Sequence, residues 1–289
     1  ALHFLSGYRA YKTTGKAGPE CADFLRMNPS LAILSEYGFR GAPITLSNAC
    51  VSSADAIGAA LDLLEDESLD AVLCGGADTL NSIPHAGFAR LMIYSDEPCR
   101  PFDKNRKGLN LGEAAAFLVL ERHEKAIAAK KTILGEIYGY GSHCDAHHFT
   151  SPHPEGLGLS MAIRDAFDRA GITSEDLAFV NAHGTGTREN DRTEGQVLRT
   201  LCPGVPVWCT KGQTGHTLGA AGALECAFSL WALNKKTLPP SIGFSEPDPE
   251  IGIGPITKTR RLDKRWALST SLGFGGGNSA LILAGGGHG

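Results

Sequence analysis

Apolar stretches of strand length alternate with helical patterns along the chain. Residues 43–50 predict a short strand, and residues 52–66 repeat small and apolar side chains at helical spacing. Two further apolar runs, 71–73 leading into Cys74-Gly-Gly-Ala-Asp78 and 114–120, predict buried strands. This part of the chain therefore indicates a strand, a helix and two more strands.

The rest of the chain continues the alternation. The pattern predicts helices at 155–171 and 215–233, strands at 177–181 and 205–209, and a terminal hairpin of 267–272 and 279–283 around a glycine run. Strands that alternate with helices favour α/β layers. Because no linker divides the chain, we assign residues 1–289 to one domain, with the polar segment 94–108 as a long surface loop.

One pattern occurs twice. A strand, a polar loop with a reactive residue and a helix of small residues run from Ile44 to Leu64 around Cys50, and again from Val205 to Leu233 around His216. Two related units of this kind place both helix N-termini near one centre. The sequence therefore predicts two related halves.

Composition narrows the class of protein. Glycine accounts for 36 of the 289 residues, about 12 % against an average of about 7 %. The net charge of −4 gives no bulk attraction to nucleic acid or anionic membranes, and no apolar run approaches the ~18 residues of a membrane helix. The N-terminus shows no secretory signal, and the eight cysteines form no C-x-x-C pair, which favours reduced thiols and a cytoplasmic location.

Cys50 ends the first predicted strand and opens the helix after it. The free N–H groups and dipole of a helix N-terminus favour a thiolate, so we expect a lowered thiol pKa and a better nucleophile. The N–H groups of the same turn are suited to an oxyanion hole. A buried structural cysteine is the alternative, because cysteine is commonly buried.

Two histidines lie at similar junctions. His183 lies in Asn181-Ala-His-Gly-Thr-Gly-Thr187, where the glycines leave the backbone open to a ligand and the threonine hydroxyls can bind an amide. His216 closes Lys211-Gly-Gln-Thr-Gly-His216, where the charge of Lys211 favours a neutral imidazole. Each histidine by itself is also consistent with a structural residue in a glycine-rich turn.

Two other clusters offer different functions. His143-Cys-Asp-Ala-His-His148, with His153 nearby, would support a metal hydrolase, but its spacing matches no standard zinc pattern and we assign no metal ligands. The run Lys258-Thr-Arg-Arg-Leu-Asp-Lys-Arg265 is typical of a solvated hairpin edge. Its alternative is a docking patch for an acidic partner.

Four ordered segments carry a family resemblance: Ser47-Asn-Ala-Cys50, Asn181-Ala-His183-Gly-Thr-Gly-Thr, Lys211-Gly-Gln-Thr-Gly-His216 and Gly273-Phe-Gly-Gly-Gly-Asn278. Together they resemble the β-ketoacyl-[acyl carrier protein] synthases, the condensing enzymes of fatty acid and polyketide synthesis. The resemblance covers residues 20–284, whereas residues 1–20 match the family poorly.

The resemblance implies a thiolase-like fold with two pseudo-equivalent βαβαβ halves in an α-β-α-β-α arrangement, which agrees with the repeated pattern. Members of the family carry a longer segment before the cysteine than residues 1–49 provide here. We therefore expect the N-terminal part of this ketosynthase domain, with its first strand and helix, to be missing from the sequence.

The resemblance also implies a reaction. Cys50 would accept an acyl chain from a carrier-protein thioester, with the N–H groups of Cys50 and Phe274 as the oxyanion hole. A malonyl thioester would then lose CO₂ and condense with the acyl group, with its enolate held by His183 and His216. The product would be a 3-ketoacyl-[acyl carrier protein] of fatty acid, polyketide or polyene synthesis.

Further roles follow from the resemblance alone. Lys211 and Glu225 would support the histidines, Thr150, Thr185 and Thr187 would contact the phosphopantetheine arm, and Phe274 would also gate the acyl pocket. The Cys-His-His set favours an elongating synthase, and a non-catalytic partner subunit of the chain-length-factor type is the alternative. The implied partners are acyl carrier protein and a second ketosynthase-like subunit in a homodimer or heterodimer. No cofactor is implied beyond the carrier's phosphopantetheine.

Overall fold

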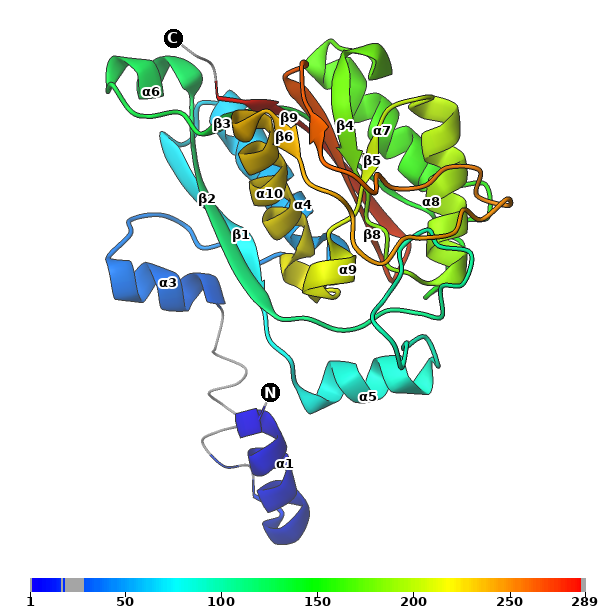
Figure 1. Ribbon diagram of the computed structural model, residues 1–289. Coiled ribbons are helices and arrows are strands. Elements are labelled where there is room, and N and C mark those ends of the chain that lie inside the picture. The colour runs from blue at the N-terminus through cyan, green and yellow to red at the C-terminus, as the bar shows by residue number, and fades with distance from the viewer. Residues whose placement is uncertain (1, 17, 19–28, 287–289) are drawn as a thin grey trace. The chain divides into compact units, whose positions relative to one another are not determined.

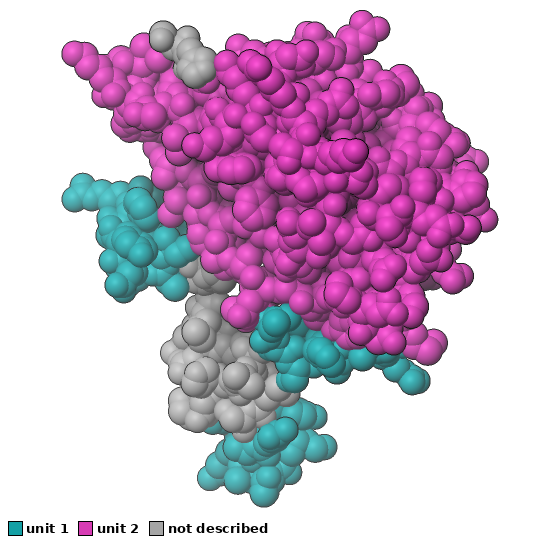
Figure 2. Space-filling view, viewed as in Figure 1, with its two compact units in different colours: residues 1–47, 80–91 teal, residues 48–79, 92–289 magenta. Residues whose placement is uncertain are grey.

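The computed structural model describes residues 2–16, 18 and 29–286. The chain divides into two compact units, one of residues 1–47 and 80–91 and the other of residues 48–79 and 92–289 (Figure 2). The assignment of residues 1–289 to one domain remains a prediction.

Where it is described, the smaller unit combines helices with irregular backbone. It contains α1 (Leu2–Thr14), α3 (Pro29–Tyr37) and α5 (Ser82–Arg90). The side chain of Asn81 caps α5 by accepting the backbone N–H of Ile83 at 3.1 Å. Within the described ranges of the whole chain, no helix combines the length and apolar composition needed to cross a bilayer.

The strand predicted at 43–50 is wrong. Residues 42–48 have irregular backbone, and Ile44 and Leu46 are exposed. A strand needs a neighbour to complete its backbone hydrogen bonds, and none of the described strands pairs with this segment. A 3-10 turn, Ala49–Val51, follows it.

A five-stranded sheet lies at the centre of the larger unit. Its strands run in the order β3 (Gly135–Cys144), β9 (Gly277–Gly285), β8 (Trp266–Gly273), β4 (Leu177–Asn181) and β5 (Val207–Trp208). β4 is parallel to β5 and β8, whereas β9 is antiparallel to β3 and β8. The sheet is therefore mixed, the fold is α/β as predicted, and β8–β9 is the predicted terminal hairpin.

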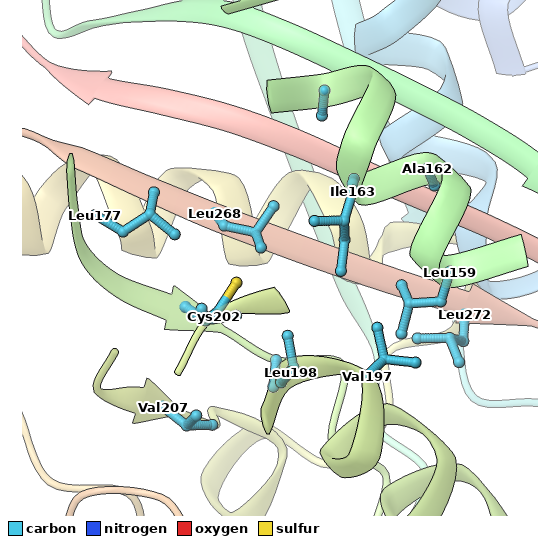
Figure 3. Packing of buried hydrophobic residues seen from close by; sticks show 14 of the residues in the cluster. Leu159, Ala162, Ile163, Leu177, Val197, Leu198, Cys202, Val207, Leu268 and Leu272 are labelled. Atoms are coloured by element: carbon cyan, nitrogen blue, oxygen red, sulfur yellow. The ribbon is translucent and has the colours of Figure 1, made fainter. Parts of the chain in front are cut away.

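Helices cover both faces of this sheet (Figure 1). α7 (Leu157–Ala170) and α8 (Arg188–Leu201) lie on one face, and α4 (Ser52–Glu65) and α10 (Ala221–Lys235) lie on the other. Figure 3 shows the buried layer under α7 and α8, where Ile163, Leu198 and Leu268 pack together. The helices at 52–66 and 155–171 and the strand at 177–181 are thus confirmed, with small shifts of their ends.

β1 (Ala71–Asp78) and β2 (Ala114–Glu121) form an antiparallel ribbon beyond α4 and α10. Its inner face packs on these helices through Cys74 and Leu118. Its outer face is exposed at Leu73, Phe117 and Val119. Both strands are confirmed, but the prediction that they are buried is wrong, because α4 and α10 cover one face only.

Helices α4 and α10 begin with the same backbone turn. The 3-10 turns Ala49–Val51 and Leu218–Ala220 precede α4 and α10, and their first residues have positive φ, 45° at Ala49 and 53° at Leu218. The helix predicted at 215–233 therefore begins later than expected, at Ala221, because the left-handed residue interrupts helical backbone. The short helix α9 (Lys211–Thr214) precedes it.

Other elements lie outside the predicted pattern. β5 is shorter than the strand predicted at 205–209, and the sequence pattern does not single out β3, α6 (His123–Ala128), α8 or the short pair β6 (Thr237–Leu238) and β7 (Arg260–Arg261). The sequence pattern does not predict β3 because this strand contains glycines, which are unfavourable in strands. They are required there: a Cβ at Gly139 or Gly141 would lie 2.1 Å from a carbonyl oxygen of α7.

Segment 94–108 is a loop, as predicted, but it lies at the surface only in part: Asp96, Lys104 and Lys107 are exposed, whereas its middle is buried. Phe102 and Asp103 are fully buried and Arg106 nearly so. Asp103 accepts the backbone N–H of Ser245 at 2.7 Å, and Arg106 pairs with Asp248 at 2.5 Å. The charges of Asp103 and Arg106 are buried because they find partners about 140 residues away in sequence, so the prediction of a surface loop is wrong for this part of the segment.

Candidate active site

Cys50 lies in the turn that opens α4, and only 6 % of it is exposed. Its Sγ lies 3.0 Å from Nε2 of His216. The backbone N–H of Phe274, in the loop between β8 and β9, also bonds to the Cys50 side chain. Close approach of this loop is eased by Gly273, where a Cβ would lie 3.2 Å from the Cys50 nitrogen. The turn that carries Cys50, the segment that carries His216 and the loop between β8 and β9 thus meet at the sulfur.

His183 and His216 lie edge to face, with ring centroids 5.1 Å apart and ring planes at 86°. His183 follows β4, and His216 precedes the turn into α10. Both rings are 2 % exposed. The structure therefore brings together the three residues, Cys50, His183 and His216, that the sequence indicates for catalysis.

Lys211 and Glu225 form a buried ion pair beside His183. The Nζ of Lys211 lies 2.6 Å from the carbonyl oxygen of His183 and 3.3 Å from its Nδ1. An ammonium group only donates, so Nδ1 accepts and the proton of the neutral ring lies on Nε2. Lys211 thereby fixes the tautomer of His183, and Glu225 compensates the buried charge.

Burial sets the protonation of the site. Desolvation, with a smaller effect of the Lys211 charge, holds the pKa values of His183 and His216 well below their usual range. Desolvation also raises the pKa of Cys50 to about 11, outweighing the Lys211 charge and the Phe274 N–H. The expected lowering of the Cys50 pKa is therefore wrong in the resting protein, because water is excluded from the helix N-terminus.

The predicted substrate-binding threonines lie on two loops. Thr185 and Thr187 follow His183, with hydroxyl oxygens 2.9 Å apart. Thr150 lies on the loop after β3, where Phe149 accepts the N–H of Gly275 at 2.7 Å. The loop of Thr150 is thus bonded directly to the loop that carries Phe274.

Two buried carboxylates on α8 escape the sequence analysis. Glu194 accepts the backbone N–H groups of His183 and Gly184 at 2.8 and 2.9 Å, and Asp191 accepts that of Gly186 at 3.1 Å. Burial raises the pKa of Glu194 to about 7. The available signal is a pair of acidic residues three positions apart, directly after the Gly-Thr-Gly-Thr segment.

The histidine-rich segment pairs with other groups. His143 lies 2.6 Å from Asp165, His148 accepts the N–H of Thr150 at 3.1 Å, and His147 packs against His153. Within residues 2–16, 18 and 29–286, no group of three or more potential ligands is placed to hold a metal ion. The metal-hydrolase alternative therefore has no ligand set in this part of the chain.

Comparison with known proteins identifies the family. The model described as "Beta-ketoacyl synthase, N-terminal domain" matches residues 20–126, and "Beta-ketoacyl synthase, C-terminal domain" matches residues 134–245. The α/β fold, with one cysteine buried beside two histidines, agrees with this ketosynthase match. This chain belongs to the beta-ketoacyl synthase family, as its resemblance predicts.

Curated relatives share this sequence over most of the chain. It is 38 % identical over 258 residues to 3-oxoacyl-[acyl-carrier-protein] synthase 2 of Synechocystis sp., covering 85 % of this chain and 62 % of the relative. Identity to the Staphylococcus aureus protein of the same name is 37 % over 261 residues, covering 86 % and 64 %. The chain thus spans less than two thirds of the length of these relatives.

Solved structures share the fold. The ishigamide ketosynthase/chain length factor matches with a TM-score of 0.92 at 32 % identity, covering 99 % of this chain and 72 % of that one. A beta-ketoacyl synthase from Burkholderia phymatum matches with a TM-score of 0.91 at 32 % identity, covering 98 % and 72 %. A ketosynthase in complex with its chain length factor from Xenorhabdus doucetiae matches with a TM-score of 0.80 at 37 % identity, covering 89 % and 63 %.

Proposed function

We propose that the protein catalyses the decarboxylative Claisen condensation of a malonyl-[acyl carrier protein] with an acyl group held on Cys50. The observation that carries this proposal is the convergence of His216 Nε2 and the Phe274 N–H on the Cys50 side chain. Relatives named 3-oxoacyl-[acyl-carrier-protein] synthase 2 support the same assignment.

Acyl transfer begins at the Cys50 thiol. Neutral His216 accepts the thiol proton at Nε2 while the sulfur attacks the thioester carbonyl, so the raised pKa does not leave the nucleophile inert. The oxyanion that forms accepts the N–H groups of Cys50 and Phe274. The phosphopantetheine thiolate then leaves and takes the proton from His216, which yields acyl-Cys50 and a free carrier thiol.

Condensation follows on a malonyl thioester beside acyl-Cys50. Its carboxylate leaves as CO₂, and the electron pair forms an enolate that accepts Nε2–H groups from His183 and His216. Acyl transfer leaves the remaining proton of His216 on Nδ1, which has no partner among the described atoms, and this proton is exchanged through solvent for one on Nε2 before the ring donates in this step. The enolate carbon attacks the acyl carbonyl, the C–S bond breaks, and Cys50 regains a proton from solvent through His216.

The same proposal covers the carrier. Its phosphopantetheine arm lies along Thr150, Thr185 and Thr187, and Phe274 gates the acyl pocket. Two matched structures support a carrier and a second subunit, identical or similar, as partners: one is a ketosynthase in complex with its chain length factor, and the other is an acyl-carrier protein in complex with its ketosynthase. A cytoplasmic location is part of the proposal.

We also propose that the chain contains parts of two pseudo-equivalent halves of a thiolase-like domain. Support comes from α4 and α10, which both begin with a positive-φ 3-10 turn and are followed by the antiparallel pairs β1–β2 and β8–β9. When the two turns are aligned on their positive-φ residues, Ala49 and Leu218, the residue that corresponds to Cys50 in the second turn is Gly219. The outer helix layer that completes an α-β-α-β-α order remains part of the proposal.

A non-catalytic partner subunit of the chain-length-factor type is the second candidate. The ishigamide structure that this chain matches is described as a ketosynthase/chain length factor, so the likeness is compatible with either role. The intact contact between Cys50 and His216 favours an enzyme. Condensation by the purified protein without a second synthase would separate the two candidates.

Acyl uptake tests the lead proposal. The purified protein is incubated with a panel of acyl carrier protein thioesters and analysed by intact-mass spectrometry. We expect the mass of one acyl group on the unchanged protein and on the control C144S, which removes the one exposed thiol among the described cysteines. C50A should gain no mass, and acyl uptake by C50A would show that the nucleophile lies elsewhere.

A further inference from the structure

Asp55 joins side chains from three parts of the larger unit. It lies in the first turn of α4 and is 8 % exposed. Its carboxylate accepts the Asn48 side-chain N–H at 2.7 Å, the Tyr140 hydroxyl at 2.9 Å and the Ser279 hydroxyl. The hydroxyl of Ser142 lies 3.4 Å away. One buried carboxylate thus accepts from four side chains.

β3 and β9 present three of these donors on one face. Ser142 and Ser279 are cross-strand partners, and Tyr140 lies two residues from Ser142. The Tyr140 ring packs on α4 at Gly58, where a Cβ would lie 2.3 Å from the ring. Burial, with a smaller effect of Asp55, raises the pKa of Tyr140, so its hydroxyl stays a donor. Asp55 therefore links α4 to the β3–β9 pair through hydrogen bonds.

The fourth donor, Asn48, belongs to the turn that carries Cys50. Its carbonyl oxygen accepts the N–H of Val51 at 3.2 Å, and its own N–H donates to Ser52 at 2.8 Å. Between Asn48 and Cys50, Ala49 has a φ of 45°. A residue with a Cβ in this region carries about 1–2 kcal/mol of strain and holds the conformation only when its surroundings enforce it.

We propose that Asp55 is a positioning residue for Cys50. Through Asn48 it holds the strained turn so that the sulfur meets the Phe274 N–H and His216 Nε2 together. Asp55 touches none of the reacting atoms. The inference rests on the proposed role of Cys50 as the nucleophile. A carboxylate suits this task because it accepts from every side, whereas an asparagine in its place has one acceptor oxygen and obliges Asn48 to rotate its own amide before the two side chains can bond.

The reactivity of the Cys50 thiol tests this role without any carrier protein. Alkylation by iodoacetamide is followed at Cys50 by peptide mass spectrometry from pH 6 to 9. We expect D55N to react about tenfold more slowly, with its pH profile moved to higher pH, because the Phe274 N–H that lowers the Cys50 pKa is lost. The double variant N48D/D55N exchanges donor and acceptor and should recover the rate to within about twofold.

Two further variants distinguish a positioning role of Asp55 from a general loss of protein stability. N48A leaves Asp55 bonded to Tyr140 and Ser279, and it should lose reactivity as D55N does. D103N removes another buried carboxylate that accepts a serine hydroxyl, here that of Ser245. It should lower the thermal midpoint while leaving the rate and pH profile of Cys50 unchanged.

A D55N or N48A rate within about twofold of the parent, a double variant without recovery, or an equal loss in D103N would overturn the positioning role. Failure of the proposed function gives a different result. In that case the alkylation rates follow the expected pattern, but Cys50 takes up no acyl group from carrier thioesters.

Discussion

Nε2 of His216 lies 3.0 Å from the sulfur of Cys50, and burial moves the two pKa values apart, upward for the thiol and downward for the imidazole. The resting pair is therefore a thiol beside a neutral imidazole. This protonation state distinguishes the site from a preformed thiolate–imidazolium pair and sets its response to pH.

The alkylation rate of Cys50 should rise about tenfold per pH unit between pH 7 and 9, because its pKa of about 11 leaves the thiolate fraction small throughout this range. Iodoacetamide labelling at constant ionic strength, with C50A as the blank, measures this slope. A plateau below pH 8 would contradict the neutral pair.

Lys211→Met should lower the free energy of unfolding by about 3–5 kcal/mol, because Glu225 is left as an unpaired buried acid. Urea denaturation measures the loss. The double variant K211M/E225Q carries no such charge and should be more stable than K211M alone. Equal stability of the two variants would show that the ion pair is not the cause.

His183→Ala should separate the two half-reactions. Acyl transfer uses Cys50, His216 and the Phe274 N–H, whereas decarboxylation also needs the donor on His183. We expect the rate of acyl-Cys50 formation to change little and the release of CO₂ from malonyl-carrier to fall about 10²–10⁴-fold. Mass spectrometry and CO₂ trapping report the two steps, and equal losses would argue against this division.

Glu194→Gln should change how stability depends on pH. The pKa of Glu194 is about 7 in the folded protein against 4.5 for the free group, so the folded state retains a proton that the unfolded chain has released. The stability from this group is present below pH 4.5 and is lost as pH rises through about 7. The parent should therefore lose stability relative to E194Q between pH 5 and 8. Urea denaturation at four pH values tests this, and a constant difference would contradict it.

Local pattern singled out Cys50, His183 and His216 as candidates, and the family resemblance gave them their expected roles. His183 follows β4 and His216 follows α9, whereas Cys50 precedes α4, and such junctions are recognisable from apolar runs and glycines. The same reasoning gave β4, α7 and the β8–β9 hairpin. The same reasoning failed at 43–50, because a strand forms only beside another strand, and the residues of this segment do not indicate whether such a neighbour is present.

The supporting carboxylates could not be found in this way. Asp55 and Ser279 are 224 positions apart, and Asp103 bonds to Ser245 across 142 positions. In sequence, Asp103 and Arg106 indicate a solvated loop. Only the tertiary fold supplies the donors and acceptors that allow these charges to be buried.

The left-handed conformation of Ala49 has a consequence for engineering. Glycine at this position would remove strain from the folded state, yet it would also remove the stiffness that a Cβ gives the nucleophile turn. Thermostability and acyl-transfer rate are therefore expected to move in opposite directions when residue 49 is varied. The turn accordingly marks a place where evolution toward a more stable chain would be opposed by selection for turnover.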